Sequence, residues 1–266
     1  MIIAFIGQPN CGKSTIFNYF AGYKAMVSNF PGTTVSYTTS QVVHRGEEIT
    51  CVDLPGVYSL TSTDQAELEA RNYLLKEEAD VIVNVMDASL LSRSLELTLE
   101  LMSLERPMVV ALNMMDEAHR KGVRINTHNL SELLGVPVVP TISSRGTGLM
   151  ELLDTAVAAG RTRVSPSQVV FSRDIEEEIA ELSDSLDIGL AQELRLPWRF
   201  FLIKLLEDDP YLLEEVERLD AGVTGLVRNH QKILAQSHGR SPEIVIASER
   251  HALSVNLFEQ VAKKAA

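Results

Sequence analysis

The stretch GQPNCGKS, residues 7–14, constrains this chain more than any other feature. It follows a short apolar run, MIIAFI, and precedes a helix-like segment, STIFNYFAG, so it joins a buried strand to the start of a helix. In a loop of this form, glycines let the backbone amides turn inward around phosphates, and the lysine reaches the β- and γ-phosphates. The serine hydroxyl ligates Mg²⁺. The spacing therefore predicts a nucleotide site made by Gly7, Gly12, Lys13 and Ser14.

The first 160 residues alternate between segments with the composition of strands and segments with the periodicity of helices. Such alternation is typical of a mostly parallel sheet flanked by helices, so we predict an α/β P-loop domain over residues 1–160. The expected strands are residues 1–6, 35–43, 47–54, 80–87, 107–113 and 136–143, and the expected helices are residues 14–22, 65–77, 95–104 and 148–160.

Beyond residue 160 the strand patterns largely disappear. Residues 161–171 read as a polar linker with a proline, and residues 172–266 as a small all-helical domain. A first helix is expected from about residue 173, with an apolar face formed by Ile175, Ile179, Leu182 and Leu186. Three more helices are expected: an apolar one opened by Pro197 and stopped by Pro210, one that ends at Gly239, and one opened by Ser241 and Pro242.

Composition narrows the class of protein. The formal net charge is −12, and both predicted domains are acidic, which argues against a nucleic-acid partner because phosphate backbones require a basic surface. Cys11 and Cys51 are too few for a disulfide framework and no secretory signal precedes them, so a reducing cytosol is expected. No stretch reaches the roughly 18 apolar residues of a membrane helix, and the chain as given is expected to be soluble.

Two further motifs follow expected strands in the order that a guanine nucleotide requires. Asp53 in DLPG can hold Mg²⁺ through a water, and the Gly56 amide faces the γ-phosphate. In NMMD, a carboxylate at Asp116 can accept hydrogen bonds from both N1–H and the exocyclic amine of guanine, a donor pair that adenine lacks. Asn113 is predicted to brace the loop. Residues 143–146, SSRG, bring a backbone amide to the guanine carbonyl.

The segment SNFPGTTVS, residues 28–36, lies between the phosphate loop and DLPG. A threonine in this place normally completes the Mg²⁺ shell when GTP is bound and is released after hydrolysis. Thr33 and Thr34 both qualify by their chemistry. The alternative interpretation of this segment is a simple turn that leads into a strand.

Together, NFPGTTVS, DLPGVYSL, NVMDASLLSRSLELTLEL, VVALNMMDEA and ISSRGTG resemble the N-terminal cytoplasmic GTPase domain of FeoB, the prokaryotic ferrous iron transporter. The resemblance is nearly continuous over the first 160 residues. It is looser over residues 161–266, where that family carries a helical domain said to slow GDP release, and LPWRFFLIKLLEDD is similar to its most recognisable helix. The resemblance implies a fragment that acts as a GTP/GDP switch on the cytoplasmic face of the inner membrane, governs Fe²⁺ uptake, and is followed by a polytopic membrane region of the same polypeptide.

The resemblance also assigns roles to residues. It implies that Thr34 is the Mg²⁺-binding switch residue. It also implies that Asn10 binds a K⁺ ion beside the β- and γ-phosphates, where a cation neutralises the charge that develops in phosphoryl transfer. The alternative for Asn10 is a local turn hydrogen bond. The expected metal ligands are Ser14, Thr34 and Asp53 for Mg²⁺ and Asn10 for K⁺, and the groups expected to act in catalysis are Asn10, Lys13, Thr34 and Gly56. The expected nucleotide-binding residues are Gly7, Asn10, Cys11, Gly12, Lys13, Ser14, Thr15, Thr33, Thr34, Asp53, Gly56, Asn113, Asp116, Ser143, Ser144 and Arg145.

Val57 stands directly after DLPG, where many GTPases carry a water-orienting glutamine. Because K⁺ does not orient a water, we expect backbone groups of residues 30–36 to do so, beside a dry wall provided by Val57, and we expect slow hydrolysis. Asp64 and Glu67 are the side-chain alternatives, although acids are also favoured at a helix N-terminus by the helix dipole.

Other suggestive residues are interpreted as structural. Cys11 reads as a spacer within the phosphate loop rather than a redox or iron sensor, and Trp198 as a core anchor. Lys263 and Lys264 are a weak signal for anionic lipid. The histidines show no metal-ligand spacing and are interpreted as surface or packing residues: His44, His119, His128, His230, His238 and His251.

Two other functions stay open on the sequence. A soluble GTPase of ribosome assembly or tRNA modification shares the phosphate loop, but such proteins usually carry a basic RNA-binding module, and residues 161–266 are acidic. A GTP/GDP sensor with negligible turnover would dock a partner through its second domain. The sequence also leaves open a homo-oligomer and small cytosolic accessory proteins of the transport system as partners.

Overall fold

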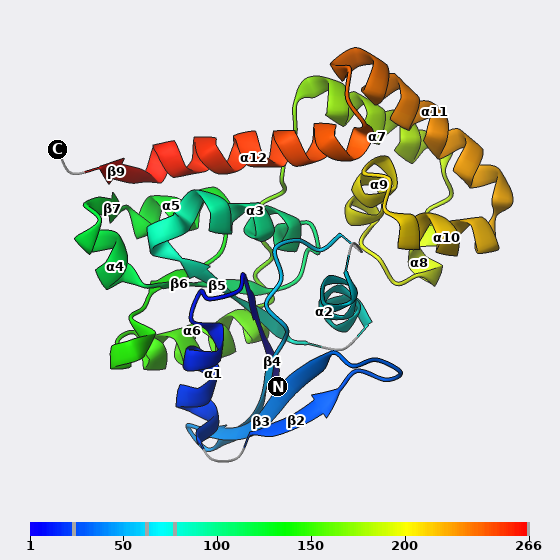
Figure 1. The fold of residues 1–266 in the computed structure, drawn as a ribbon. Helices are drawn as coiled ribbons and strands as arrows, with labels where there is room; N and C mark the ends of the chain where they lie inside the picture. Colours follow the sequence, from blue (N-terminus) through cyan, green and yellow to red (C-terminus); the bar gives the residue numbers. More distant parts are fainter. Residues whose placement is uncertain (23–24, 62–63, 77–78, 265–266) are drawn as a thin grey trace.

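The computed structural model describes residues 1–22, 25–61, 64–76 and 79–264. Its main strands are β1 (Ile2–Gly7), β2 (Met26–Asn29), β3 (Ser36–His44), β4 (Glu47–Asp53), β5 (Val81–Asp87), β6 (Met108–Asn113) and β8 (Val138–Pro140). They form a seven-stranded sheet in the order β2-β3-β4-β1-β5-β6-β8 (Figure 1). The strands from β4 to β8 in this order run parallel, whereas β3 is antiparallel to both β4 and β2. The predicted mostly parallel sheet is confirmed.

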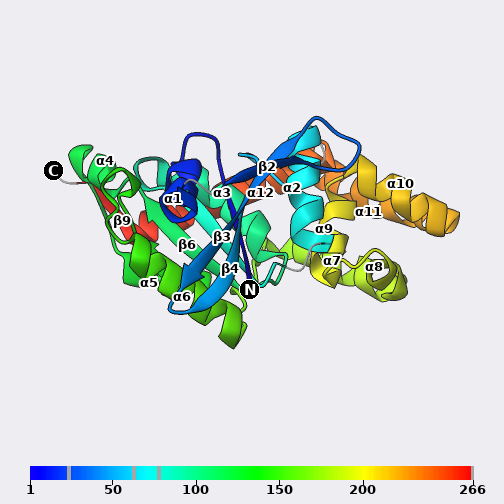
Figure 2. The same cartoon turned by 90° about the horizontal axis from the view of Figure 1, so that it is seen from below.

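Helices cover both faces of the sheet because the central strands are apolar on both sides. Ile3 and Phe5 of β1 belong to the cluster shared with α1 (Lys13–Ala21) and α6 (Leu149–Thr162). Ala4 and Ile6 belong to the other cluster, together with residues of α2 (Gln65–Lys76), α3 (Leu91–Met102) and α5 (Thr127–Leu134). Figure 2 shows this layering from the side of α1 and α6.

The short elements of this part were not predicted. They are β2, α4 (Met115–Arg120), α5 and β7 (Val123–Ile125). All residues of β2 are exposed, so the strand carries no burial pattern that a sequence could display, and it exists because it pairs with β3. The other three are too short to show a reliable period.

The remainder of the chain is helical, as predicted, and consists of α7 (Arg173–Ser185), α8 (Gly189–Glu193), α9 (Trp198–Leu206), α10 (Pro210–Leu219), α11 (Ala221–His238) and α12 (Pro242–Val261). The predicted apolar face of α7 is buried through Ile175, Ile179 and Leu182. Leu186 lies one residue beyond the helix, at its C-cap. At one end of the molecule, α7, α8, α10 and α11 pack around α9 (Figure 1). We call this group of helices, residues 173–238, the helical bundle.

The prediction that Pro210 stops the apolar helix was wrong. α9 already ends at Leu206, and Pro210 begins α10. A proline is favoured at the first helical position because its missing N–H would have no intrahelical partner there. Asp209 caps α10 by accepting a hydrogen bond from the Leu212 amide at 2.9 Å. Gly239 ends α11 as predicted.

α12 leaves the helical bundle and returns along α3 and α5 of the first part (Figure 1). Ser241 precedes α12 as predicted, although within the described chain its side chain makes no capping hydrogen bond. The helix leads into β9 (Ala262–Lys264), which pairs antiparallel with β7. β9, which was not predicted, is short and contains Lys263 and Lys264, and strands are otherwise scarce in the described residues after 160, as expected. In the part of the chain that the structure describes, no helix is long and apolar enough to cross a membrane.

Candidate functional site

The predicted phosphate loop joins the end of β1 to the start of α1. Asn10 and Gly12 take left-handed backbone conformations, with φ of 66° and 88°. A Cβ atom on Gly12 would lie 2.2 Å from Asn113 Nδ2, and one on Gly7 would lie 2.3 Å from the Val85 carbonyl oxygen. Both glycines are therefore required by close approaches of neighbouring segments. The loop leads directly into the N-terminus of α1, whose partial positive charge and free amides favour an anion.

A cavity of about 480 Å³ opens over this loop. The residues that line it are Gln8, Pro9, Asn10, Gly12, Lys13, Ser14, Thr15, Gly56 and Met114. Asp53, at the end of β4, connects to two of them: the Lys13 ammonium donates to Asp53 Oδ1, and the Ser14 hydroxyl donates to Oδ2 at 2.9 Å. The structure thus brings Lys13, Ser14 and Gly56 to one cavity, with Asp53 bonded to the first two.

The donor set fits a magnesium ion. The Ser14 hydroxyl and the Asp53 carboxylate stand side by side, and Mg²⁺ prefers such hard oxygen ligands. Thr34 lies in the turn between β2 and β3 and is exposed. Asn10 is exposed and lines the same cavity, so its amide oxygen is available to a monovalent cation.

Asn113, at the end of β6, fastens three segments together although none of its surface is exposed. Its Nδ2 donates to the Cys11 carbonyl oxygen at 2.9 Å and to Ser143 Oγ at 3.0 Å. Its Oδ1 accepts from the Ser143 amide at 3.0 Å and from the Thr141 hydroxyl at 3.2 Å. The side chain therefore locks the phosphate loop to the loop that follows β8.

Asp116 lies in the first turn of α4, with its side chain 37% exposed. Met114 precedes the helix in a left-handed conformation and lines the cavity. Arg145 Nη2 lies 3.9 Å from Asp116 Oδ2, in the short turn Ser143–Arg145 that also contains Ser144. One Asp116 carboxylate oxygen accepts from the Glu117 amide at 3.0 Å, which fixes the carboxylate at the helix start.

The two threonines of the 28–36 segment differ in their surroundings. Thr33 Oγ1 donates to the Phe30 carbonyl at 3.3 Å and accepts from the Val35 amide at 3.2 Å, so the Thr33 hydroxyl is used within the turn. Phe30 anchors the turn by packing on Tyr37, with ring centroids 4.7 Å apart. Thr34, the next residue of the turn, is exposed.

Val57 does not provide the expected wall of the site. Its side chain is 2% exposed and belongs to the apolar core cluster, and it is not among the described residues that line the cavity. Its amide donates to the Gly7 carbonyl at 3.2 Å. Asp64 accepts from the Glu67 amide at 2.8 Å, and Glu67 accepts from the Ser59 amide at 3.1 Å, so both acids make bonds at the start of α2.

The residues interpreted as structural are placed accordingly, with one addition. Burial raises the pKa of the Cys11 thiol to about 11, outweighing a hydrogen bond with the Lys13 backbone, so this thiol stays protonated at neutral pH. Trp198 stacks on Phe201 and donates to Ser183 Oγ at 2.9 Å. The spacing of the histidines in the sequence suggests no metal site, but in the structure His230 lies near Glu178 and Glu181. The potential ligand atoms of these three residues are all within 4.8 Å of one another.

Sequence reasoning missed three side chains that shape the site. Gln8 donates to the Arg93 carbonyl at 2.8 Å and holds the phosphate loop against the start of α3. Thr141 donates to Asn113 Oδ1, and Met114 lines the cavity. Gln8 and Thr141 have no pattern in the sequence, because each acts through a partner far along the chain.

The family model of ferrous iron transport protein B matches residues 1–156, and the model of the FeoB cytosolic helical domain matches residues 171–263. The Fe(2+) transporter FeoB of Salmonella choleraesuis is 39% identical over 235 residues, which are 85% of this chain and 30% of that protein. An Fe(2+) transport protein A/FeoB fusion protein of Porphyromonas gingivalis is 39% identical over 211 residues, which are 78% of this chain and 25% of that protein. The chain spans between a quarter and a third of the length of these relatives.

Solved structures agree over nearly the whole chain. A mutant of S. thermophilus NFeoB bound to GDP matches with a TM-score of 0.89 and 30% identity, covering 99% of this chain and 100% of that one. The cytosolic domain of the T. maritima FeoB iron transporter in its apo form matches with a TM-score of 0.83 and 29% identity, covering 99% of each chain. The predicted P-loop GTPase fold followed by a helical part is confirmed, and the chain belongs to the FeoB family of ferrous iron transport proteins.

Proposed function

We propose that this chain binds GTP and hydrolyses it slowly, with stimulation by K⁺, as the nucleotide switch of a ferrous iron transporter. The observation that carries the proposal is the position of Asn113, which joins the phosphate loop to the Ser143–Arg145 turn within hydrogen-bonding distance. Through it, a phosphate-binding end and a guanine-reading end form one continuous site. A GDP-bound structure of an NFeoB relative supports the same ligand class.

At the phosphate end, the backbone amides that the phosphate loop carries would surround the phosphates, and Lys13 would leave Asp53 to neutralise their charge. Ser14, Thr34 and Asp53 would hold Mg²⁺, which would offset the negative charge of the phosphates. Thr34 is favoured over Thr33 for this role because the Thr33 hydroxyl is already bonded within its own turn. The Gly56 amide would face the γ-phosphate.

At the base end, Asp116 would accept two hydrogen bonds from guanine, while backbone groups of Ser143, Ser144 and Arg145 would lie against its carbonyl. Asn10 would hold K⁺ on the phosphate side, where a fixed positive charge stabilises the transition state in place of an arginine. With Val57 in the core, orientation of the water falls to backbone groups of residues 30–36.

The larger context is also part of the proposal. The relatives are described as Fe(2+) transporters, so we assign this chain to the cytoplasmic face of the inner membrane, attached to a membrane region of the same polypeptide. We divide it into a GTPase domain, residues 1–160, a linker, residues 161–171, and a helical domain, residues 172–266. The two family models, which end and begin at 156 and 171, support this division. Exchange of GDP for GTP would regulate Fe²⁺ uptake.

Single-turnover GTP hydrolysis in KCl and in NaCl tests the proposal, on the natural chain and on Asn10→Ala. The expected result is hydrolysis that K⁺ accelerates by about 10-fold or more and that loses this acceleration in the variant, because the cation removes part of the activation barrier. Asn18→Ala is the matched control, since Asn18 is exposed on α1 outside the cavity.

Binding of a fluorescent GDP analogue to the same proteins separates turnover from affinity. If hydrolysis is equal and near zero in both salts although the nucleotide binds tightly, the protein is a GTP/GDP sensor and not an enzyme. Val57 favours this alternative because its side chain cannot orient a water. Absence of binding would overturn the proposal altogether.

A further inference from the structure

Three side chains with the chemistry of metal ligands meet between α7 and α11, which lie side by side in the helical bundle (Figure 1). Glu178 and Glu181 are three residues apart on α7 and therefore share one face of that helix. His230 reaches them from α11, and its Nδ1 lies 2.7 Å from Glu178 Oε2. The potential ligand atoms of the three residues are all within 4.8 Å of one another. Two carboxylates and an imidazole thus converge from two helices.

The three side chains differ in their access to solvent. Those of Glu178 and His230 are 11% and 12% exposed, whereas Glu181 is exposed. Among the described residues, the Glu181 carboxylate makes no hydrogen bond and no ion pair. Two of the groups are therefore held in place by packing, and the third is free at the surface, where an ion can enter. Acids outnumber bases along α7, so the local potential attracts a cation.

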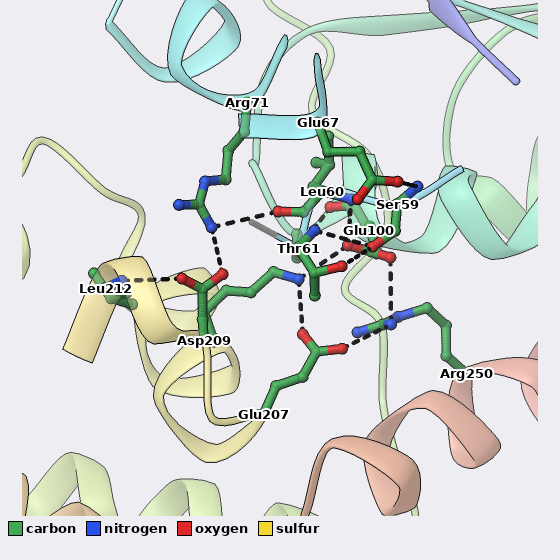
Figure 3. A network of polar contacts seen from close by, with 12 residues as sticks. Ser59, Leu60, Thr61, Glu67, Arg71, Glu100, Glu207, Asp209, Leu212 and Arg250 are labelled. Carbon is green, nitrogen blue, oxygen red and sulfur yellow. Dashed lines mark hydrogen bonds and ion pairs between the residues drawn. The ribbon is translucent and has the colours of Figure 1, made fainter. Parts of the chain in front are cut away.

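Figure 3 shows how two other buried acids, Glu100 and Glu207, are neutralised. Lys204 donates to Glu100 at 3.0 Å and to Glu207 at 2.7 Å, and Arg250 of α12 lies 3.0 Å from Glu207. We call these four side chains the buried cluster. Glu178 differs from them, because no lysine or arginine of the described residues pairs with it and its partner is an imidazole. A metal ion would supply the positive charge that a buried carboxylate requires.

The arrangement fits a metal ion in its dimensions and in its donors. Bonds of about 2.0–2.2 Å place tetrahedral ligands about 3–3.5 Å apart, and the exposed Glu181 side chain can rotate to close the remaining distance. The ion would replace the proton between His230 Nδ1 and Glu178 Oε2, and that proton would pass to the solvent. Imidazole and carboxylate together favour first-row divalent ions such as Fe²⁺, Co²⁺ and Zn²⁺, whereas Mg²⁺ and Ca²⁺ prefer oxygen ligands alone.

We infer that Glu178, Glu181 and His230 form a binding site for a first-row divalent transition-metal ion. Each residue gives one ligand atom, water completes the coordination, and the ion joins α7 to α11. The site is separate from the Mg²⁺ and K⁺ ligands proposed for the nucleotide cavity, none of which it shares. It therefore does not depend on the binding or hydrolysis of a nucleotide.

A second histidine–carboxylate pair on the same two helices provides a matched control. His238 Nε2 lies 2.5 Å from Asp174 Oδ2. Within the part of the chain that the structure describes, no third ligand joins this pair. The two pairs thus differ in the feature on which the inference depends, the additional carboxylate of Glu181.

Titration with Co²⁺, which unlike Fe²⁺ is stable in air, tests the site. GDP and an excess of Mg²⁺ are present throughout, so that the nucleotide cavity does not take up Co²⁺. Isothermal titration calorimetry measures the affinity and the number of ions bound. Trp198 reports where the ion binds, because it is the single tryptophan of the chain and donates to Ser183 of α7 at 2.9 Å. Co²⁺ held at Glu181, two residues before Ser183, should quench its fluorescence.

The natural chain should bind one Co²⁺ and lose Trp198 fluorescence as it does so. Glu181→Gln and His230→Gln should each weaken binding by at least about 10-fold, since even a change outside the ligands themselves costs that much. Glu181 is exposed, and a glutamine at position 230 can still donate to Glu178, so both variants should fold. His238→Gln and Glu177→Gln should change the affinity by less than about twofold, because salt screens exposed charges that do not touch the ion.

Three results would overturn the inference. Absence of Co²⁺ binding to the natural chain would remove the site. Equal affinity in the natural chain and in both ligand variants would place the ion elsewhere, and an equal loss in the controls would mean diffuse attraction by an acidic helix.

Competition examines the role of the imidazole. Zn²⁺ should displace Co²⁺, whereas Ca²⁺ should not, and displacement by Ca²⁺ as effective as that by Zn²⁺ would contradict a histidine ligand. None of these measurements uses GTP turnover. Absence of hydrolysis would therefore refute the proposed enzyme activity and leave the test of the metal site unaffected.

Discussion

At the residue scale, the site depends on two neighbouring side chains with different tasks. Asn113 is fully buried and makes its hydrogen bonds within the protein, so it determines where the loops stand. Asp116 is partly exposed in the first turn of α4, and its Oδ2 lies 3.9 Å from Arg145 Nη2. Asn113 therefore builds the site, whereas Asp116 is free for the recognition of the base that we propose for it.

Replacing Asp116 by Asn should change which base is preferred. The variant loses the acceptor pair for guanine, but its amide can donate to the carbonyl that xanthine carries in place of the exocyclic amine. We expect GTP affinity to fall by about 10- to 100-fold, the value of a charged hydrogen bond, and affinity for xanthosine triphosphate to rise. Competition binding against a fluorescent GDP analogue measures both.

Glu117→Gln is the control for this substitution, because the Glu117 carboxylate bonds Arg120 on the surface. It should leave both affinities unchanged. An equal loss of both nucleotides in Asp116→Asn would mean that Asp116 supports the loop rather than reads the base.

At the element scale, α9 is the helix around which the helical bundle is built. Every residue from Phe200 to Leu206 is buried, so the helix is enclosed on all sides by α7, α10, α11 and the first part of the chain. Lys204 is buried within this apolar helix only because Glu100 and Glu207 neutralise it. α9 thus serves both as core and as carrier of the contact to α3.

Phe201→Ala should lower the free energy of unfolding by about 3–5 kcal/mol, since it removes a large, fully buried ring and leaves a cavity. Trp198 stacks on Phe201 with ring centroids 5.5 Å apart and is the single tryptophan of the chain, so urea unfolding can be followed by its fluorescence. Ile233→Ala on α11, at a side chain 47% exposed, should cost less than about 0.5 kcal/mol. Similar losses in the two variants would contradict the assignment of α9 as the core.

At the scale of the whole molecule, the buried cluster makes stability depend on pH. Burial of Glu100 raises the pKa of its carboxyl group, but the positive charges of Arg250 and Lys204 lower this pKa by more than burial raises it. The pKa therefore falls from its usual 4.5 to about 2. In the unfolded chain Glu100 binds a proton at higher pH than in the folded protein. The stabilisation is therefore complete above pH 4.5 and is lost as the pH falls towards 2.

Urea unfolding between pH 5 and pH 2.5 should show this loss. The natural chain is expected to lose stability more steeply than Glu100→Leu with Lys204→Met, with a difference that approaches one proton, about 1.4 kcal/mol per pH unit. The control is Glu176→Gln with Arg199→Gln, which removes an ion pair inside the helical bundle but keeps Glu100. It should retain the pH dependence of stability that Glu100 contributes. Parallel slopes in the natural chain and the Glu100 variant would contradict a depressed pKa.

The sequence by itself determined the elements and motifs whose residues are close neighbours along the chain. The phosphate loop, DLPG and NMMD each occupy a few consecutive residues at the end of a strand, and parallel strands bring such ends to one edge of a sheet. The class of fold, the apolar face of α7 and the meeting of Lys13, Asp53 and Asn113 follow from these local patterns.

Only the tertiary structure decided what joins distant segments. Glu100 and Lys204 read in the sequence as ordinary charges on two helices, yet they are buried against each other 104 residues apart. The return of α12 onto α3 and the pairing of β9 with β7 have the same origin. Periodicity states which face of a helix is apolar but not which partner covers it, and a buried charge is tolerated only where the fold supplies an opposite one.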